Sequence, residues 1–128
     1  MKRHQIREMV MICLYQYLLL KIDQDKIIEN NSERLNSLKD NEFFISLFQY
    51  AIINHVAFED KINLALVDWK FDRLGYVEQA ILLLAVSELT LKETDKAVII
   101  NEAVELAKTY GDEKSFQLIN GVLDNIND

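Results

Sequence analysis

The last quarter of the chain constrains the fold most strongly, because residues 98–126 hold two amphipathic patterns separated by one turn. In each pattern apolar residues recur every three or four positions, which is typical of helices that bury one face. We expect Gly111 to end the first helix with a positive φ angle and Asp112 to cap the second. Gly121 costs about 1 kcal/mol inside a helix relative to alanine, so we expect another helix to approach it closely. The stretch therefore predicts a helical hairpin that packs on a core through Ile99, Ala103, Leu106 and Tyr110, then Phe116, Ile119, Val122, Leu123 and Ile126.

Helical patterns also fill the rest of the chain. The sequence has no proline and only three glycines, too few for the many turns of a β-sandwich or barrel. Apolar residues nearly encircle one predicted helix, residues 76–91, which places it at the centre. We predict a single all-α domain, residues 1–128, with an N-terminal group of helices over about 1–68 and a C-terminal group over about 69–128. The remaining predicted helices cover about residues 3–20, 26–38, 42–55 and 58–67, with an irregular or single-turn passage at 69–75.

The first predicted helix carries both a buried stripe and a basic end. The protein has a net charge of −7, which is unsuited to binding nucleic acid over its whole surface. Lys2, Arg3 and Arg7, however, all precede the first acidic residue, and Tyr15 beside them is able to stack on an unpaired base. These residues are candidates for a local RNA contact; an ordinary charged helix start with a half-buried tyrosine is the alternative. The buried stripe of this helix is expected to be Ile6, Met9, Val10, Cys13, Tyr17 and Leu20. The lone cysteine lies within this stripe and is therefore interpreted as a structural thiol.

Nothing in the sequence predicts catalysis, a bound metal or a cofactor. There is no glycine-rich phosphate loop and no Cys/His cluster with metal-ligand spacing. His4 and His55 share no evident carboxylate, and Glu102 and Glu105 are interpreted as a solvated helix face. Glu102 is also expected to form polar bonds across the hairpin. The longest purely apolar run, residues 80–86, is too short to span a bilayer, and the N-terminus lacks the features of a signal peptide, so we expect a cytoplasmic protein.

Three groups of residues carry a family resemblance. The hairpin contributes Ile100-Asn101-Glu102-Ala103-Val104-Glu105-Leu106-Ala107-Lys108, Tyr110-Gly111 and Asn120-Gly121-Val122-Leu123-Asp124. The N-terminus contributes Arg7-Glu8 and Leu14-Tyr15-Gln16, and the middle contributes Asp72-Arg73-Leu74-Gly75, Val77-Glu78, Ala80-Ile81-Leu82, Leu84-Ala85 and Glu88-Leu89. Together these segments resemble the NusB family of bacterial transcription antitermination factors. The resemblance implies a NusB-like fold of about seven helices in two small bundles that share one core.

The same resemblance implies an RNA-binding adaptor without enzymatic activity. Members of the family bind boxA, a short single-stranded RNA element of ribosomal RNA leaders, together with NusE, which is also a protein of the small ribosomal subunit. The pair joins RNA polymerase and other Nus factors to suppress early termination. Carried over by position, the RNA-binding residues are Lys2, Arg3, Arg7 and Tyr15, and Glu78 lies on the partner-binding side. No cofactor, metal or membrane is implied, and homodimer formation stays open.

Some residues depart from the family pattern and keep alternatives open. Leu83 replaces a common arginine of the central helix, Ser87 replaces a tyrosine, and Leu118 replaces an aromatic residue near Asn-Gly. These differences predict a weak RNA affinity of the protein alone and a greater dependence on NusE. The first alternative is a protein-only helical adaptor or homo-oligomer with little RNA affinity. The second is a fragment of an RNA cytosine methyltransferase, which the absence of a downstream cofactor domain in this sequence disfavours.

Overall fold

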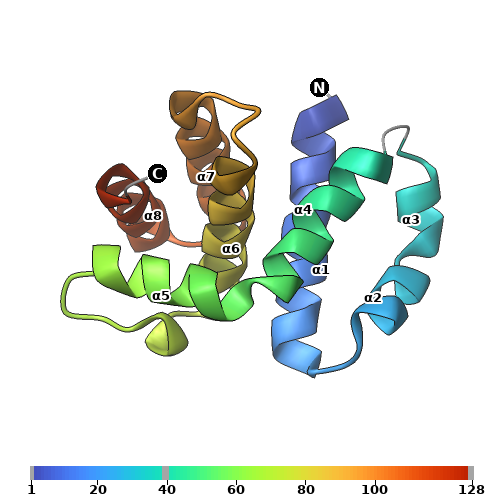
Figure 1. Ribbon diagram of the computed structural model, residues 1–128, viewed down its shortest axis with the longest axis horizontal. Helices are drawn as coiled ribbons and strands as arrows, with labels where there is room; N and C mark the ends of the chain where they lie inside the picture. The colour runs from blue at the N-terminus through green and yellow to red at the C-terminus, as the bar shows by residue number, and fades with distance from the viewer. Residues whose placement is uncertain (1, 39–40, 127–128) are drawn as a thin grey trace.

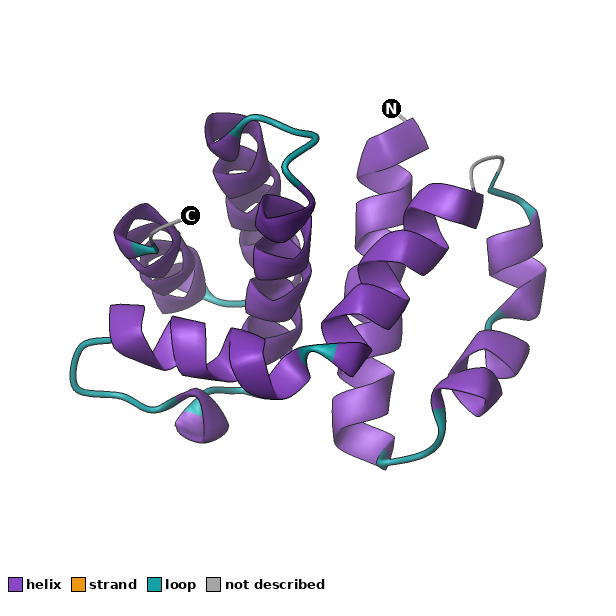
Figure 2. Ribbon diagram, viewed as in Figure 1, coloured by secondary structure: helices purple, strands orange, loops and turns teal. Residues whose placement is uncertain are grey.

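The computed structural model describes residues 2–38 and 41–126, with side chains described from Arg3 onward. Every regular element within these residues is helical, as predicted, and none of them is a strand (Figure 2). The predicted connection at residues 39–41 falls largely outside this description. The elements are α1 (Lys2–Leu20), α2 (Gln24–Asn30), α3 (Ser32–Asn36), α4 (Asn41–Ile53), α5 (His55–Ala65), the single-turn 3₁₀ helix η1 (Phe71–Arg73), α6 (Tyr76–Leu91), α7 (Lys96–Tyr110) and α8 (Glu113–Asn125).

Two groups of helices meet along α1 and α6. In Figure 1, α1 to α4 lie on one side of the molecule and α5 to α8 on the other. α6 packs against α1, α4, α5, α7 and α8, so it joins the two groups. α5 packs against α6 and α8 and lies spatially with the C-terminal helices; the division near residue 68 stays a prediction. No helix in the described ranges is long and apolar enough to cross a membrane.

The helix predicted over residues 26–38 is instead two short helices, α2 and α3, which meet at Asn31. The backbone there has φ −109° and ψ 10°, outside the helical region. The buried Asn31 side chain donates hydrogen bonds from Nδ2 to the Ile27 carbonyl oxygen and to Gln16 Oε1, both at 2.7 Å. Because an asparagine side chain competes with the hydrogen bonds of the helix backbone, it interrupts a pattern that apolar spacing alone makes continuous.

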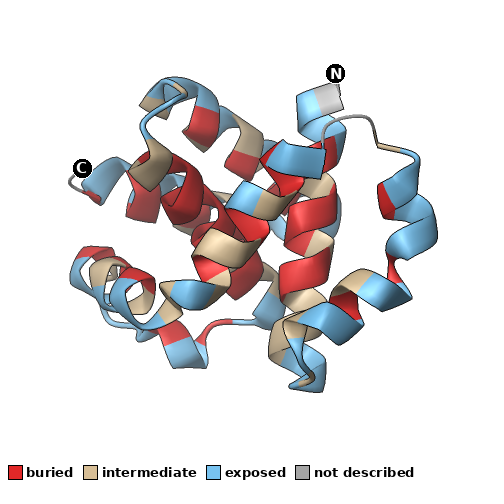
Figure 3. Ribbon diagram, turned by 45° about the vertical axis from the view of Figure 1, so that its right-hand side comes forward, coloured by how far each residue is buried: buried red, intermediate tan, exposed pale blue. Residues whose placement is uncertain are grey.

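The core is centred on α6, where residues 79–89 are all buried (Figure 3). This confirms the prediction of a central helix over residues 76–91. The buried polar side chains of α6 have partners: Gln79 Nε2 donates to the Leu74 carbonyl oxygen at 2.9 Å, and Ser87 Oγ donates to that of Leu47 at 3.0 Å. Each large aliphatic side chain buried along α6 contributes roughly 1.5–3 kcal/mol, so this helix supplies much of the cohesion between the two groups.

α1 lies between α4 and α6 and is buried on more sides than the sequence predicts. Its buried apolar residues are the expected Ile6, Met9, Val10 and Cys13, and in addition Met11 and Leu14. The Cys13 side chain is fully buried, as expected of a structural thiol, and this burial raises its pKa to about 12. Tyr17 is half-buried. The expectation for Leu20 is wrong, since its side chain is 52% exposed where the last turn of α1 extends beyond its neighbours (Figure 1).

The hairpin forms as predicted, but both glycines have different roles from those expected. Gly111 has φ −104°, so it needs no left-handed conformation. It is needed for space, because a Cβ atom there would lie 2.6 Å from Ser115 Cβ and 2.9 Å from the Ala107 carbonyl oxygen. Asp112 is confirmed as the cap of α8: its Oδ1 accepts the backbone N–H groups two and three residues on, at 2.9 and 3.0 Å. At Gly121 a Cβ would meet no described atom within 4 Å, so the expected close helix approach is wrong.

Candidate functional site

The N-terminal half of α1 is fastened to α6 and α7 by a buried ion pair. Arg7 Nε donates to Glu88 Oε1 at 2.8 Å and Nη2 donates to Glu88 Oε2 at 2.7 Å, a bidentate arrangement. The third guanidinium nitrogen, Nη1, lies 3.4 Å from Glu102 Oε1. Arg7 is only 6% exposed and Glu88 2%, and hydrogen bonding to Glu88 raises the pKa of Arg7. The predicted RNA-binding arginine therefore has its donors turned inward, onto carboxylates of two other helices.

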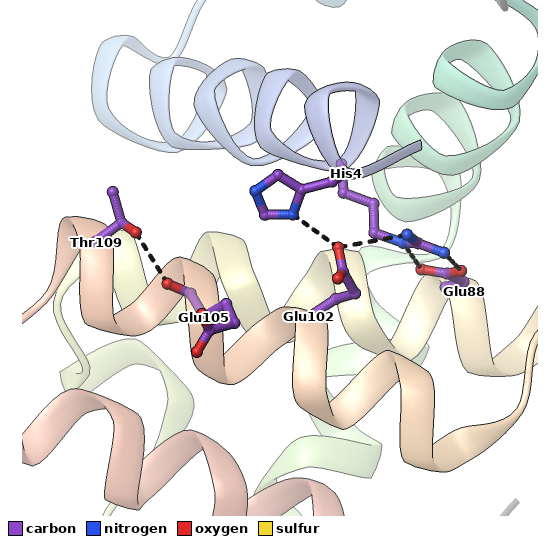
Figure 4. Close-up of polar contacts among 6 residues, drawn as sticks. His4, Glu88, Glu102, Glu105 and Thr109 are labelled. Carbon is purple, nitrogen blue, oxygen red and sulfur yellow. Dashed lines mark hydrogen bonds and ion pairs between the residues drawn. The ribbon is translucent and has the colours of Figure 1, made fainter. Parts of the chain in front are cut away.

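Glu102 connects this buried pair to the surface. Its Oε1 lies 2.9 Å from His4 Nδ1, so one carboxylate contacts two residues of α1 (Figure 4). The interpretation of Glu102 as a solvated residue, and the expectation that it bonds across the hairpin, are both wrong: it reaches from α7 to α1. Glu105, one turn further along α7, is exposed and pairs at 3.7 Å with Lys108. The difference arises because Glu102 lies within reach of His4 and Arg7 on α1, whereas Glu105 contacts Lys108 of its own helix.

Arg3 has a different environment from Arg7, although the two lie one helical turn apart. Its guanidinium carbon is 4.0 Å from the centre of the Phe43 ring on α4, a cation–π distance, while the side chain stays exposed. The Arg7 guanidinium carbon lies 5.4 Å from the same ring. Lys2 opens α1, and its side chain lies outside the described residues. Phe43 is a residue of this site that the sequence analysis missed, since only the tertiary structure brings α4 to the start of α1.

Tyr15 and Glu78, predicted separately, meet at a second location. Both line an open hollow of about 490 Å³ between α1, the start of α6 and the turn of the α7–α8 hairpin. Glu78 Oε1 accepts the Gly75 backbone N–H at 3.1 Å, and Oε2 accepts the Ser115 hydroxyl at 2.8 Å. Tyr15 is half-buried and stands twelve positions beyond Arg3, roughly 18 Å along the helix. The structure thus separates the predicted stacking residue from the basic end of α1.

The hollow is acidic. Among the described residues that line it, Glu78 and Asp112 are the charged ones. On its α7 side, the hydroxyl of Tyr110 donates to Glu8 Oε2 at 2.7 Å, and this hydrogen bond raises the pKa of Tyr110. The sequence analysis placed Tyr110 on the packing face of the hairpin, which is wrong, since its side chain is 40% exposed and lines this hollow. Ser115 is a further residue of the hollow that the sequence analysis did not assign, because its relation to α6 has no local signal. The arrangement suits a partner that offers cations and hydrogen-bond donors.

The positions that depart from the family pattern lie mainly in the interior. Leu83 is 2% exposed, and Ser87 is buried with its hydroxyl bonded to the backbone of α4. Leu118 is half-buried in α8. Among the residues whose positions are described, no three His, Cys, Asp or Glu side chains come together in a way that could hold a metal ion.

Sequence and structure comparisons define the class of protein. The NusB family model matches residues 4–128. The transcription antitermination protein NusB of Sulfurovum sp. (strain NBC37-1) is 44% identical over 128 residues, covering 97% of this chain and 96% of the relative. That of Bacillus cereus (strain B4264) is 40% identical over 130 residues, covering 100% and 98%. The chain therefore belongs to the NusB family, which confirms the resemblance.

Solved structures agree with this assignment. The crystal structure of antitermination factors NusB and NusE in complex with dsRNA matches with a TM-score of 0.87 and 29% identity, covering 96% of this chain and 93% of that chain. T. maritima NusB matches with a TM-score of 0.86 and 31% identity, covering 95% and 87%. The all-helical NusB-like fold is thereby confirmed.

Proposed function

We propose that this protein is a transcription antitermination factor that binds boxA-type single-stranded RNA together with NusE and helps RNA polymerase read through ribosomal RNA operons. Membership of the NusB family across residues 4–128 carries the proposal. It is supported by a structural neighbour in which NusB and NusE are in complex with dsRNA. The role is one of positioning RNA, NusE and polymerase with other Nus factors, in the bacterial cytoplasm, and it involves no catalysis.

In this proposal the RNA contacts start at the basic end of α1. Lys2 and Arg3 provide phosphate contacts, and Phe43 holds the Arg3 guanidinium in place through its ring face. Arg7 acts by fixing the start of α1 against α6 and α7, since its guanidinium is already bound by Glu88 and Glu102. Tyr15 offers a half-buried aromatic ring further along α1, on which a base is able to stack for about 1–3 kcal/mol.

NusE is proposed to bind over the acidic hollow that contains Glu78. A ribosomal protein rich in cations would find Glu78 and Asp112 there, and none of the described residues that line the hollow is basic. The net charge of −7 would also speed its association, because complementary charges steer diffusional encounter.

The alternative is a protein-only adaptor or homo-oligomer with little RNA affinity of its own. The observation that favours it is the burial of Arg7, which leaves fewer exposed cations at the start of α1 than the sequence suggests. Two phosphate contacts on single-stranded RNA give a salt slope of only about −1.4, which corresponds to weak binding.

Fluorescence anisotropy with a boxA-like RNA and a scrambled RNA, with and without NusE, tests the proposal. We expect preference for boxA that tightens with NusE, a salt slope reduced by about 0.7 in Arg3→Ala, and no change in the matched control Lys26→Ala. Weaker NusE binding by Glu78→Gln, but not by the exposed Glu105→Gln, would support the proposed NusE surface. NusE binding without preference for boxA would establish the protein-only alternative, and binding of neither would refute the function.

A further inference from the structure

His4 lies at the basic end of α1, in the turn between Arg3 and the buried Arg7, and its side chain is 48% exposed. Its Nδ1 lies 2.9 Å from Glu102 Oε1, a contact that holds the imidazole ring against α7. Nε2 points away from Glu102 (Figure 4), and no side chain described from Arg3 onward bonds it. Within this part of the chain the ring is therefore fixed through one nitrogen and can offer the other to a ligand.

The contact with Glu102 decides what the second ring nitrogen can do. An ionised carboxylate only accepts hydrogen bonds, so the hydrogen of a neutral imidazole lies on Nδ1 and leaves Nε2 as an acceptor. A phosphate oxygen approaching Nε2 would then meet a lone pair. An imidazolium carries a hydrogen on both nitrogens. Only the protonated ring is therefore able to bond Glu102 and a phosphate at the same time.

The charges around the ring favour the same conclusion. Two carboxylates, Glu102 on α7 and Glu88 on α6, face a single guanidinium, that of Arg7. While His4 is neutral, this cluster has one negative charge in excess, which repels a phosphate. Protonation of His4 balances the cluster and adds a hydrogen-bond donor on its exposed side.

The other charged groups nearby do not change this balance. Glu105, one turn further along α7, pairs with Lys108 at 3.7 Å. Glu8, one turn further along α1, accepts the Tyr110 hydroxyl at 2.7 Å. On the α4 side, the guanidinium of Arg3 lies over an aromatic ring. The imidazole is thus the group whose protonation decides whether this corner of the molecule attracts a phosphate.

We infer that His4 is a further RNA-contact residue, which in its protonated form donates from Nε2 to a phosphate of single-stranded RNA while Nδ1 stays bonded to Glu102. The inference rests on the proposed function, and it gives His4 the phosphate contact that the buried Arg7 does not make. RNA binding then takes up a proton, so the affinity rises as the pH falls and decreases as the ring loses its proton. Because the contact is made to phosphate, it adds affinity without preference for a base sequence.

Fluorescence anisotropy with NusE present, at several salt concentrations and at pH 6 and pH 8.5, tests this inference. We expect the wild type to bind a boxA-like RNA about three- to tenfold more tightly at pH 6, between the values for an exposed ion pair and a charged hydrogen bond. The salt slope should be steeper by about 0.7 at pH 6, because one more phosphate is neutralised. A scrambled RNA should show the same change with pH.

Three variants separate His4 from other groups that titrate. His4→Gln should bind at both pH values as weakly as the wild type does at pH 8.5, and His4→Arg, which stays charged, should keep the tighter binding and the steeper slope at both. His55→Gln is the matched control, because the His55 side chain is 44% exposed and also contacts a carboxylate, Glu59 Oε2 at 2.9 Å, but lies on α5. We expect it to behave as the wild type does. In NMR spectra of protein with ¹⁵N-labelled histidine, RNA should raise the fraction of His4 rings that carry two hydrogens.

The outcomes distinguish the inference from the proposed function. If His4→Gln lowers the free energy of unfolding but leaves RNA affinity unchanged at both pH values, His4 only fastens α1 and the inference is overturned. Equal pH dependence in the wild type and His4→Gln also overturns it, because another group then titrates. In both cases a retained preference for boxA leaves the proposed function standing. Binding that depends on pH and on His4 but does not prefer boxA supports the inference and refutes the proposed sequence preference, whereas a wild type that binds neither RNA at pH 6 overturns both.

Discussion

Replacing Arg7 by alanine should damage the fold before it affects any RNA contact. The change removes both charged hydrogen bonds to Glu88, at 2.8 and 2.7 Å. Glu88, which is only 2% exposed, then stays buried without its counter-charge. Removing one partner of a buried ion pair costs about 3–5 kcal/mol. A domain of 128 residues has a total stability of roughly 6–19 kcal/mol, so the loss is a large fraction of it.

The loss in the free energy of unfolding is measured by urea denaturation monitored by circular dichroism, and Arg3→Ala is the matched control. Arg3 lies one turn earlier on α1 and is exposed, so its removal should cost less than about 1 kcal/mol. We expect the melting temperature of Arg7→Ala to fall by roughly 10–20 °C. The double variant Arg7→Met/Glu88→Leu should recover most of the stability, because an apolar pair avoids the cost of an unpaired charge. The reasoning is refuted if Arg7→Ala unfolds within 1 kcal/mol of the wild type.

Three further outcomes follow from the described contacts. Gly111→Ala should destabilise the protein by about 1–3 kcal/mol, because the new Cβ would lie 2.6 Å from Ser115 Cβ. Gly121→Ala, in open space within a helix, should stabilise it by about 0.5–1 kcal/mol. Changes of the same sign in the free energy of unfolding, measured by chemical denaturation, would contradict this reasoning. Cys13, with a thiol pKa of about 12 and no exposure, should react with iodoacetamide at pH 8 only as fast as the protein unfolds, so labelling of the native protein at the rate of a free thiol would exclude burial. The pKa of Asp112 is lowered from 3.8, chiefly by the hydrogen bond from the Ser115 backbone, so its contribution to stability is present above pH 4 and is lost as pH falls through the lower folded value. Asp112→Ala should therefore be less stable than wild type at pH 7 and converge with it near pH 2, and a constant difference across that range would show that the carboxylate charge is irrelevant.

Local sequence determined most of the helices and one of their caps, but not the break between α2 and α3 at Asn31. Apolar spacing located α1, α4, α6 and the α7–α8 hairpin to within one or two residues, because each helix buries a stripe or, for α6, nearly its whole circumference. Asp112 was identifiable as an N-cap because capping depends only on the residues that follow it. The family was likewise predictable, since its motifs are runs of neighbouring residues.

Only the tertiary structure decided what the charged residues and glycines do. Arg7 and Arg3 occupy equivalent positions in the sequence pattern, yet one meets Glu88 from α6 and the other meets Phe43 from α4. Gly111 is required by the approach of Ser115 and not by its own φ angle, while Gly121 faces open space. Spacing along a helix fixes the direction of a side chain but not the partner that another helix places there. For this reason the sequence determined most of the helices and the family, and the contacts of α1 with α4, α6 and α7 determined that Arg7 is buried in an ion pair while Arg3 lies exposed over Phe43.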